Sequence, residues 1–371
     1  MKLLDQWCAV QGVPGTDRAM STFPAVICLP PGELLLAYRI GSTKDSDDEA
    51  IEVCRSLDGG RTWTPPERPF ASVLDGVRGS LKVLYWTRVA PDRLLACTMW
   101  VDREAWPGQP LFNAATEGCL PMAIAIASSA DGGRSWGPWD RVTLPREVGP
   151  PSLTAPLLVL GPGHLAMSIE SNKDWQDASP WMQRVVHFHS RDGGRTWPEC
   201  VVTGEDPSGR VFNWDQRVAQ AADGCLATFT WTYDSQDKVY RNIHRRVSGD
   251  QGRTWSPPED LGITDQAGHP AVLADGSVVL PWVDRFGDRS IKVRRAASLT
   301  APFAAASELS LYELPTPPAS GRQSTGELLA DMGVWTFGLP FACALPDGNV
   351  LVLFYAGEAG QLDIRAALLR P

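Results

Sequence analysis

An eight-residue pattern, Ser-x-Asp-x-Gly-Arg-Thr/Ser-Trp, occurs four times along this chain, at residues 56–63, 129–136, 190–197 and 248–255. These four segments are called the boxes below. A motif that returns roughly every 60 residues indicates one structural unit copied along the chain. The repeat therefore limits the fold to architectures built from similar units that pack side by side.

The residues around each box predict β-strands. Apolar runs at 50–54, 122–127 and 185–189 precede three of the boxes, and the residues upstream alternate between apolar and polar with Pro/Gly turns between them. The Asp-Gly-Gly core supplies the positive-φ positions of a tight hairpin, and the Ser and Asp side chains can accept backbone N–H groups in the turn. The Trp then fills the gap between adjacent sheets. Calcium binding is the alternative function of the box carboxylates Asp58, Asp131, Asp192 and Asp250.

Two further units lack the box but keep its first two strands, because residues 269–285 and 339–357 match residues 23–39. The six units begin near Phe23, Leu81, Leu153, Arg217, His269 and Leu339. We predict an all-β single domain over residues 1–371, a six-bladed β-propeller with four-stranded antiparallel blades. Residues 3–10 are expected to supply the outer strand of the last blade, and residues 324–333 a short helix in the connection between blades five and six.

Composition narrows the functional classes. With 371 residues, 43% of them hydrophobic, the chain can bury a large core. No apolar run approaches the ~18 residues that cross a bilayer, and no signal segment is seen, so a cytoplasmic location without membrane contact is predicted. A net charge of −9 disfavours nucleic acid as a partner. The eight cysteines contain no CxxC pair, so free thiols are expected, with no metal site and no cofactor; the oligomeric state is left open.

Strand order decides where a ligand can bind. In an up-and-down blade, the start of the inner strand and the end of the second strand share one face of the ring, and the boxes lie on the other face. Carboxylates, arginines and indoles on the first face match what a sugar needs, since aromatic rings stack on CH groups and charged side chains bind hydroxyls. The predicted substrate-binding residues are Arg39, Arg217, Trp231, Tyr233, Asp234, Asp284, Arg285 and Arg289.

Boxes on a six-bladed propeller give the chain a resemblance to the sialidase (neuraminidase) superfamily over nearly its whole length. The resemblance implies an arginine at the end of the second strand followed six residues later by an acid/base aspartate, a spacing that Arg39 and Asp45 have. It also implies a carboxylate-binding arginine at the start of the third strand of blade five, where Arg289 stands. The implied substrate of such a site is a sugar.

Other positions depart from that family. The first family arginine is replaced in the stretch Thr22-Phe23-Pro24, and Trp214 and Trp231 occupy the positions of a glutamate and a second arginine. Leu339 stands where the family has its nucleophilic tyrosine. These departures predict a sialidase-like propeller with altered chemistry, acting on a substrate other than sialic acid.

Glycoside hydrolysis on a different sugar needs two carboxyl groups, about 5–5.5 Å apart for retention or about 6.5–9.5 Å for inversion. Asp45, in the acidic loop 44–49, is the first choice for the acid, and a solvated acidic turn is its structural alternative. Asp215 is the favoured partner because residues 213–217 open an inner strand, and a salt bridge to Arg217 is its alternative. The other candidates for the partner are Glu170, Asp234 and Asp284.

His269 is the third predicted catalytic residue, a general base at the start of the inner strand of blade five. A ring that bonds only to a backbone carbonyl is the alternative. Trp231 or Tyr233 is expected beneath the ligand, or else in the core. Insertions at 101–118 and 171–183 are expected to form walls of the pocket.

These features favour an exo-acting glycoside hydrolase on a small glycan or glycoside. One alternative is a non-catalytic propeller that binds glycans or proteins. Another is a uronic-acid lyase in which His269 or Tyr233 removes a proton and Arg289 neutralises the carboxylate.

Overall fold

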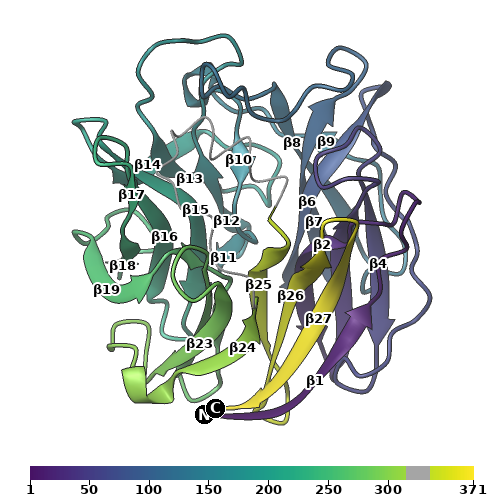
Figure 1. Cartoon of the computed structure of the whole chain (residues 1–371), viewed down its shortest axis with the longest axis vertical. Helices are drawn as coiled ribbons and strands as arrows, with labels where there is room; N and C mark the ends of the chain where they lie inside the picture. The colour runs from purple at the N-terminus through teal and green to yellow at the C-terminus, as the bar shows by residue number, and fades with distance from the viewer. Residues whose placement is uncertain (315–334) are drawn as a thin grey trace.

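The computed structural model describes residues 1–314 and 335–371, and Figure 1 shows its strands arranged in sheets around a central axis. The described residues form six antiparallel sheets, which confirms the predicted six-bladed β-propeller. Helical structure in the described part is limited to two 3₁₀ turns, η1 (Arg146–Val148) and η2 (Ala305–Ser307). The helix predicted within residues 324–333 lies outside the described residues.

The first three blades follow one another along the chain. Blade one contains β2 (Thr22–Leu29), β3 (Glu33–Ile40) and β4 (Ala50–Ser56). Blade two contains β5 (Val73–Leu74), β6 (Val77–Ala90), β7 (Arg93–Asp102), β8 (Met122–Ser129) and β9 (Asp140–Arg141). Blade three contains β10 (Ser152–Leu153), β11 (Leu158–Gly161), β12 (His164–Glu170), β13 (Arg184–Ser190) and β14 (Glu199–Glu205).

The remaining blades complete the ring. Blade four contains β15 (Val211–Gln220), β16 (Leu226–Asp234), β17 (Val239–Tyr240), β18 (Asn242–Ser248) and β19 (Glu259–Thr264). Blade five contains β20 (Gln266–Ala267), β21 (Ala271–Val272), β22 (Val278–Asp284), β23 (Ser290–Ala296) and β24 (Leu309–Glu313). Blade six contains β25 (Phe337–Ala344), β26 (Val350–Glu358), β27 (Gln361–Arg370) and β1 (Lys2–Val10).

Blade six joins the two ends of the chain. Strand β1 pairs antiparallel with β27, from Lys2 opposite Arg370 to Val10 opposite Ile364. The two termini therefore lie together at the lower end of the molecule in Figure 1. This is the arrangement expected for residues 3–10.

Strand number differs from the expected four in blade one. Its sheet has three strands, and a fourth is reduced to a single bridge between Val53 and Glu67. The segment that carries Glu67 contains Pro65, Pro66 and Pro69, which lack the N–H that a strand ladder needs. A continuous fourth strand is therefore disfavoured here.

The four boxes share one turn geometry. In each, the serine Oγ accepts a hydrogen bond from the backbone N–H of the glycine four residues later. Gly60 N lies 2.9 Å from Ser56 Oγ, and Gly252 N lies 2.9 Å from Ser248 Oγ. The aspartate accepts the N–H and hydroxyl of the residue four positions later, as Asp250 does from Thr254 at 2.9 and 2.6 Å. Both carboxylate oxygens are thus used inside the turn, which supports the structural interpretation of the boxes.

No helix among residues 1–314 and 335–371 is long and apolar enough to span a bilayer. All eight cysteines are free thiols.

Candidate active site

A cavity of about 160 Å³ opens on the propeller axis, and residues from all six blades line it. Phe23, Lys82, Thr154, Trp214 and Gln266 represent the first five blades, and Tyr355 the sixth. A cavity of this size has room for on the order of ten water molecules, which suits a ligand no larger than one sugar ring. None of the box residues contributes to this lining.

Three inner strands turn a side chain into the cavity by the same device. Phe23, Asp215 and Leu339 have φ values of 52°, 50° and 45°, and each lies at a register shift in β2, β15 or β25. All three line the cavity. A non-glycine residue in the left-handed region is strained by about 1–3 kcal/mol, and such strain clusters at functional sites.

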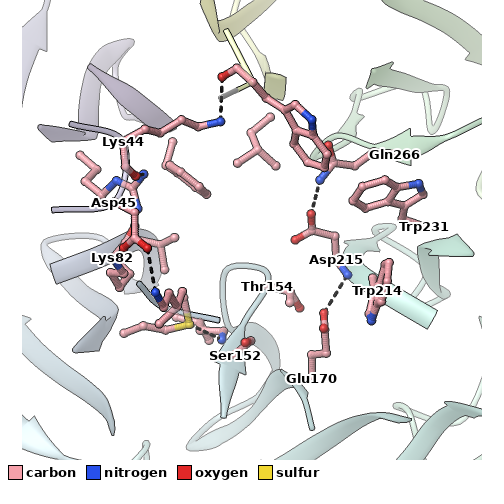
Figure 2. Close-up of a pocket in the computed structure, with 18 of the residues that line it drawn as sticks. Lys44, Asp45, Lys82, Ser152, Thr154, Glu170, Trp214, Asp215, Trp231 and Gln266 are labelled. Atoms are coloured by element: carbon pink, nitrogen blue, oxygen red, sulfur yellow. Dashed lines mark hydrogen bonds and ion pairs between the residues drawn. The ribbon is translucent and has the colours of Figure 1, made fainter. Parts of the chain in front are cut away.

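Two carboxyl groups, Glu170 and Asp215, meet on one wall. Glu170 ends β12 in blade three, and Asp215 lies on β15 in blade four. The backbone N–H of Asp215 donates to Glu170 Oε2 at 2.9 Å. The left-handed backbone at Asp215 therefore aims its N–H at one carboxyl group while its own carboxylate faces the cavity, as Figure 2 shows.

The environment of Glu170 favours its neutral form. Burial, with a smaller contribution from the nearby Asp215 charge, raises the pKa of Glu170 to about 8. Its side chain is almost fully buried, and the hydrogen bond from Asp215 and the charge of Arg217 oppose the shift only in part. A carboxyl group that keeps its proton at neutral pH can act as a general acid.

Asp215 is held by neighbours on two blades. Arg217 Nη2 lies 3.3 Å from its Oδ1, and the amide of Gln266 donates to its Oδ2. Arg217 is itself fixed by the Tyr85 hydroxyl at 2.9 Å and by the carbonyl of Thr154. The side chain of Asp215 stays 30% exposed, so its carboxylate can reach a ligand.

Arg285 extends this wall into blades five and six. Its guanidinium donates to Gln266 Oε1 from Nε at 3.1 Å and from Nη2 at 2.5 Å, and to the Phe337 carbonyl at 2.8 Å. It also lies 4.0 Å from the ring centroid of Trp335. Among the described residues, no carboxylate lies within salt-bridge distance of this guanidinium.

The opposite wall is an ion-pair network between blades one and two. Lys82 Nζ lies 2.6 Å from Asp45 Oδ1 and 2.5 Å from Glu49 Oε2, and Arg39 lies 3.1 Å from Glu49 Oε1. Arg103 adds a contact to Asp45 at 3.4 Å. Figure 2 shows Asp45 and Lys82 across the cavity from Glu170 and Asp215.

This network changes the role expected for Asp45. Burial alone would raise the pKa of Asp45, but the charge and hydrogen bond of Lys82 and the N–H of Leu111 at 2.7 Å lower it overall. An aspartate that stays ionised and has both oxygens occupied is poorly suited to donate a proton. Of the two carboxyl groups, Glu170 therefore has the environment that suits a proton donor, and Asp45 does not.

Aromatic rings complete the lining. Trp214 and Trp231 form part of one side of the cavity. Behind them, Tyr233 stacks on Trp214 with ring centroids 5.2 Å apart, and Tyr240 stacks on Trp231 with ring centroids 4.6 Å apart. Phe23 lies on the other side of the cavity, under the guanidinium of Arg39. The Cζ atom of Arg39 is 4.1 Å from the ring centroid of Phe23. Flat rings next to charged groups suit the alternating CH and OH surfaces of a sugar.

The two predicted insertions are hydrogen-bonded to each other. Pro110, Leu111 and Phe112 of the first insertion line the cavity. The second insertion is tied to the first, because the Trp175 carbonyl accepts Asn113 Nδ2 at 2.9 Å and Thr116 Oγ1 at 2.6 Å. The prediction that both insertions form walls of the pocket therefore holds for residues 101–118 and is wrong for residues 171–183, none of which lines the cavity.

The structure brings six of the eleven predicted site residues to the cavity and leaves five outside it. Those that line it are Arg39, Asp45, Asp215, Arg217, Trp231 and Arg285. Those that do not are Tyr233, Asp234, His269, Asp284 and Arg289.

His269 lies beneath the cavity floor, in a separate void of about 10 Å³ that Arg217 and Phe341 also line. Its ring stacks on Phe341 with centroids 4.1 Å apart, and burial lowers the pKa of His269 to about 3. The prediction that His269 lies at the cavity mouth assumes that the inner strand of blade five starts at this residue. Strand β20 starts at Gln266 instead, which carries His269 deeper into the ring.

The other four residues have structural contacts. Asp234 is fully buried between Arg210 and Arg241, at 2.8 and 2.5 Å, and its hydrogen bond with Arg210 lowers its pKa. Asp284 accepts the N–H groups of a following turn. Tyr233 packs behind Trp214, and Arg289 directly precedes β23 and does not line the cavity.

Lys82 and Gln266 line the cavity but were not among the predicted site residues. Lys82 stands within an apolar strand at a register shift between Leu81 and Val83, which turns it inward. A lysine inside an apolar run of a predicted inner strand is a signal that could have identified it. Gln266 carries no comparable signal, because a single amide near a strand start is common.

The fold is a six-bladed β-propeller with an axial pocket, an architecture that solved structures of an arabinanase and a trans-sialidase also have. The structure is similar to a protein of unknown function from Dyadobacter fermentans, with a TM-score of 0.72 and 20% identity over 98% of this chain and 99% of that chain. It is also similar to the Penicillium chrysogenum α-L-arabinanase complexed with arabinobiose (TM-score 0.64, 15% identity, 99% and 98% covered). A third similar structure is the intramolecular trans-sialidase from Ruminococcus gnavus in complex with oseltamivir carboxylate (TM-score 0.63, 14%, 97% and 97%).

No family model matches the sequence, and no curated protein matches it either. At these identities the structural likeness establishes the fold.

Proposed function

We propose that this protein is an exo-acting glycoside hydrolase that removes a terminal sugar from a small glycan or glycoside bound in the axial cavity. Glu170 acts as the proton donor and Asp215 as the second carboxylate. The observation that carries the proposal is the buried Glu170 carboxyl group, which accepts the backbone N–H of Asp215, beside the partly exposed Asp215 carboxylate on a strained backbone. Burial raises the pKa of Glu170 to about 8, in keeping with a proton donor. An α-L-arabinanase and an α-L-arabinofuranosidase among the similar structures support the reaction class.

The chemistry follows from the two carboxyl groups. Glu170 donates its proton to the glycosidic oxygen as the bond breaks. Asp215 either attacks the anomeric carbon, forming a glycosyl ester that water then hydrolyses with Glu170 accepting the proton of that water, or takes a proton from a water that attacks directly. In both cases it stabilises the positive charge that develops on the sugar ring. The configuration of the released sugar distinguishes these two routes.

The surrounding residues bind and orient the sugar. Trp231 and Trp214 offer aromatic surface on the side of Asp215. Arg285 has guanidinium hydrogen bonds only to neutral acceptors among the described residues, so its charge is available to an electron-rich group of the ligand. Asp45, held in the ion-pair network, shapes the opposite wall.

A panel of nitrophenyl glycosides tests the proposal. It should include α-L-arabinofuranosides, sialosides, uronides and neutral hexopyranosides. We expect turnover of at least one member, with kcat reduced about 10²- to 10⁴-fold by Glu170→Gln and by Asp215→Asn. Glu147→Gln, an exposed carboxylate outside the cavity, is the matched control and should leave kcat unchanged.

Three other results would contradict this assignment. Binding of a glycan without turnover would support the non-catalytic alternative. A product that absorbs in the ultraviolet through a new C=C bond would support the lyase, although His269 and Tyr233, its predicted bases, do not line the cavity. Full activity of Glu170→Gln would exclude Glu170 as the acid.

A further inference from the structure

We propose that Gln266 is a positioning residue for Asp215, holding its carboxylate in one orientation. The inference rests on the proposed function, in which Asp215 reacts directly. It concerns a residue that does not contact the scissile bond itself.

Gln266 is built into the ring at the point where blades four and five meet. It is 3% exposed and lies on β20, opposite Val283 of β22. Its Nε2 donates to Asp215 Oδ2, and its Oε1 accepts both Nε and Nη2 of Arg285. The amide thus bridges a cation on blade five and a carboxylate on blade four.

Hydrogen-bond chemistry fixes which way this amide points. Arginine has only donors, so the oxygen of Gln266 must face Arg285. The NH₂ group must then face Asp215 Oδ2, and it can bond only to an acceptor. The bridge therefore holds Asp215 Oδ2 opposite a donor and fixes the orientation of that oxygen.

Arg285 cannot easily release the amide. Its Nη1 donates to the Phe337 carbonyl at 2.8 Å, and its backbone N–H donates to Asp265 Oδ2 at 2.6 Å. Trp335 covers one face of the guanidinium. The amide orientation is therefore set by contacts that do not involve Asp215.

Gln266 differs from the other groups around Asp215. Arg217 attracts the Asp215 carboxylate by charge, but its guanidinium also donates hydrogen bonds to the Tyr85 hydroxyl and the Thr154 carbonyl. Glu170 receives the Asp215 backbone N–H and does not orient the carboxylate. The titratable or charged groups that face Asp215 are Glu170 from β12, Arg217 from β15, Tyr85 from β6 and Tyr355 from β26.

Gln266→Glu replaces the donor with a carboxylate of the same shape and is the sharpest kinetic test. Two facing oxygens favour the uptake of one proton, so we expect the acidic limb of the kcat profile to move up by about one pH unit. Gln183→Glu is the matched control, because Gln183 is equally buried beside β15 but bonds only to the backbone of Asn213. The control should leave the acidic limb in place, and a Gln266→Glu profile identical to that of the natural protein would overturn the inference.

A second measurement does not depend on turnover. The double variant Asp215→Asn/Gln266→Glu places an amide donor at position 215 opposite a carboxylate acceptor at position 266. The donor and acceptor roles of the two positions are thus exchanged. We expect the unfolding midpoint of the double variant at pH 7 to exceed that of Gln266→Glu alone. The difference should shrink as the pH falls and the facing carboxylates of the single variant take up a proton.

The two measurements separate failure of the inference from failure of the proposed function. If no glycoside is turned over but the double variant recovers stability, the bridge is real and the hydrolase assignment fails. If the effects of the two substitutions on stability are additive at every pH, the bridge does not control Asp215 and the inference fails, whatever the activity.

Discussion

At the scale of single residues, the two carboxyl groups proposed to react have different surroundings. Glu170 is almost fully buried, whereas Asp215 is 30% exposed and is held by an arginine and an amide. The difference in environment separates an acid from a carboxylate, although both side chains are of similar chemistry. The left-handed φ of Asp215 shows that backbone strain is part of this arrangement.

The raised pKa of Glu170 makes a prediction about stability. The folded pKa of about 8 lies above the ordinary value of 4.5, so the contribution of this group is complete below pH 4.5 and is lost as the pH rises through about 8. In Glu170→Gln that loss should be absent. Urea unfolding at pH 5, 7 and 9 should show the natural protein weakening relative to the variant as the pH rises.

Glu147→Gln serves as the control for this measurement, because its side chain is exposed and outside the cavity. An unfolding free energy whose pH dependence is the same in Glu170→Gln and in the natural protein would show that Glu170 ionises normally.

Only part of the site is predictable at this scale. The register of the second strands brings Arg39, Trp231 and Arg285 to the cavity as expected. Strand alternation places Tyr233, two residues after Trp231, on the same face of the strand as Trp231. It does not show that Tyr233 packs behind Trp214. The sequence also gives no measure of burial, which is what distinguishes Glu170 from the other candidate carboxylates.

At the scale of elements, the boxes stabilise turns that lie outside the axial cavity. In the fourth box, Ser248 accepts the N–H of Gly252 at 2.9 Å and donates to Asp250 at 2.8 Å. The serine is buried, so its partners have no water to replace it. The repeated motif therefore serves the fold of each blade.

Ser248→Ala should leave the N–H of Gly252 without its acceptor and lower the free energy of unfolding by about 1–3 kcal/mol. Denaturant unfolding measures this loss. Ser310→Ala on β24, an exposed serine, is the control and should change stability little. Equal effects of the two substitutions would mean that the box serine adds nothing to stability.

The elements themselves are largely predictable because period-two alternation and Gly-rich turns recur in each unit. The inner strands begin at Thr22, Val77, Ser152, Val211, Gln266 and Phe337, within a few residues of the expected starts. Register shifts in β2, β6, β15 and β25 leave no mark in that alternation. These shifts turn Asp215 and Lys82 toward the cavity, so the orientation of these two side chains cannot be predicted from the alternation.

At the scale of the whole molecule, burial leaves several histidines unable to accept protons easily. His187 is fully buried, its Nε2 lies 3.1 Å from Gln216 Nε2, and burial lowers its pKa to about 3. Burial also lowers the pKa values of His164, His189 and His244. The unfolded chain binds these protons near pH 6.5, so acid favours unfolding.

His187→Gln tests this at a single ring. The contribution of neutral His187 is present above pH 6.5 and is lost as the pH falls from 6.5 toward about 3. The stability advantage of the natural protein over the variant should therefore narrow between pH 7 and pH 4, as followed by thermal unfolding. His244→Gln should show a smaller narrowing because its ring is less buried. An advantage that does not vary with pH would show that His187 titrates normally.

The pairing of β1 with β27 has a consequence for how the ring can be assembled. Since Lys2 lies opposite Arg370, a short linker could join the two ends without disturbing any blade. New termini opened in an exposed loop between other blades would then give a circular permutant with the same set of strand pairs. In such a permutant the last blade would form from adjacent chain segments, so its closure would become a local folding event instead of one that waits for both ends of the polypeptide.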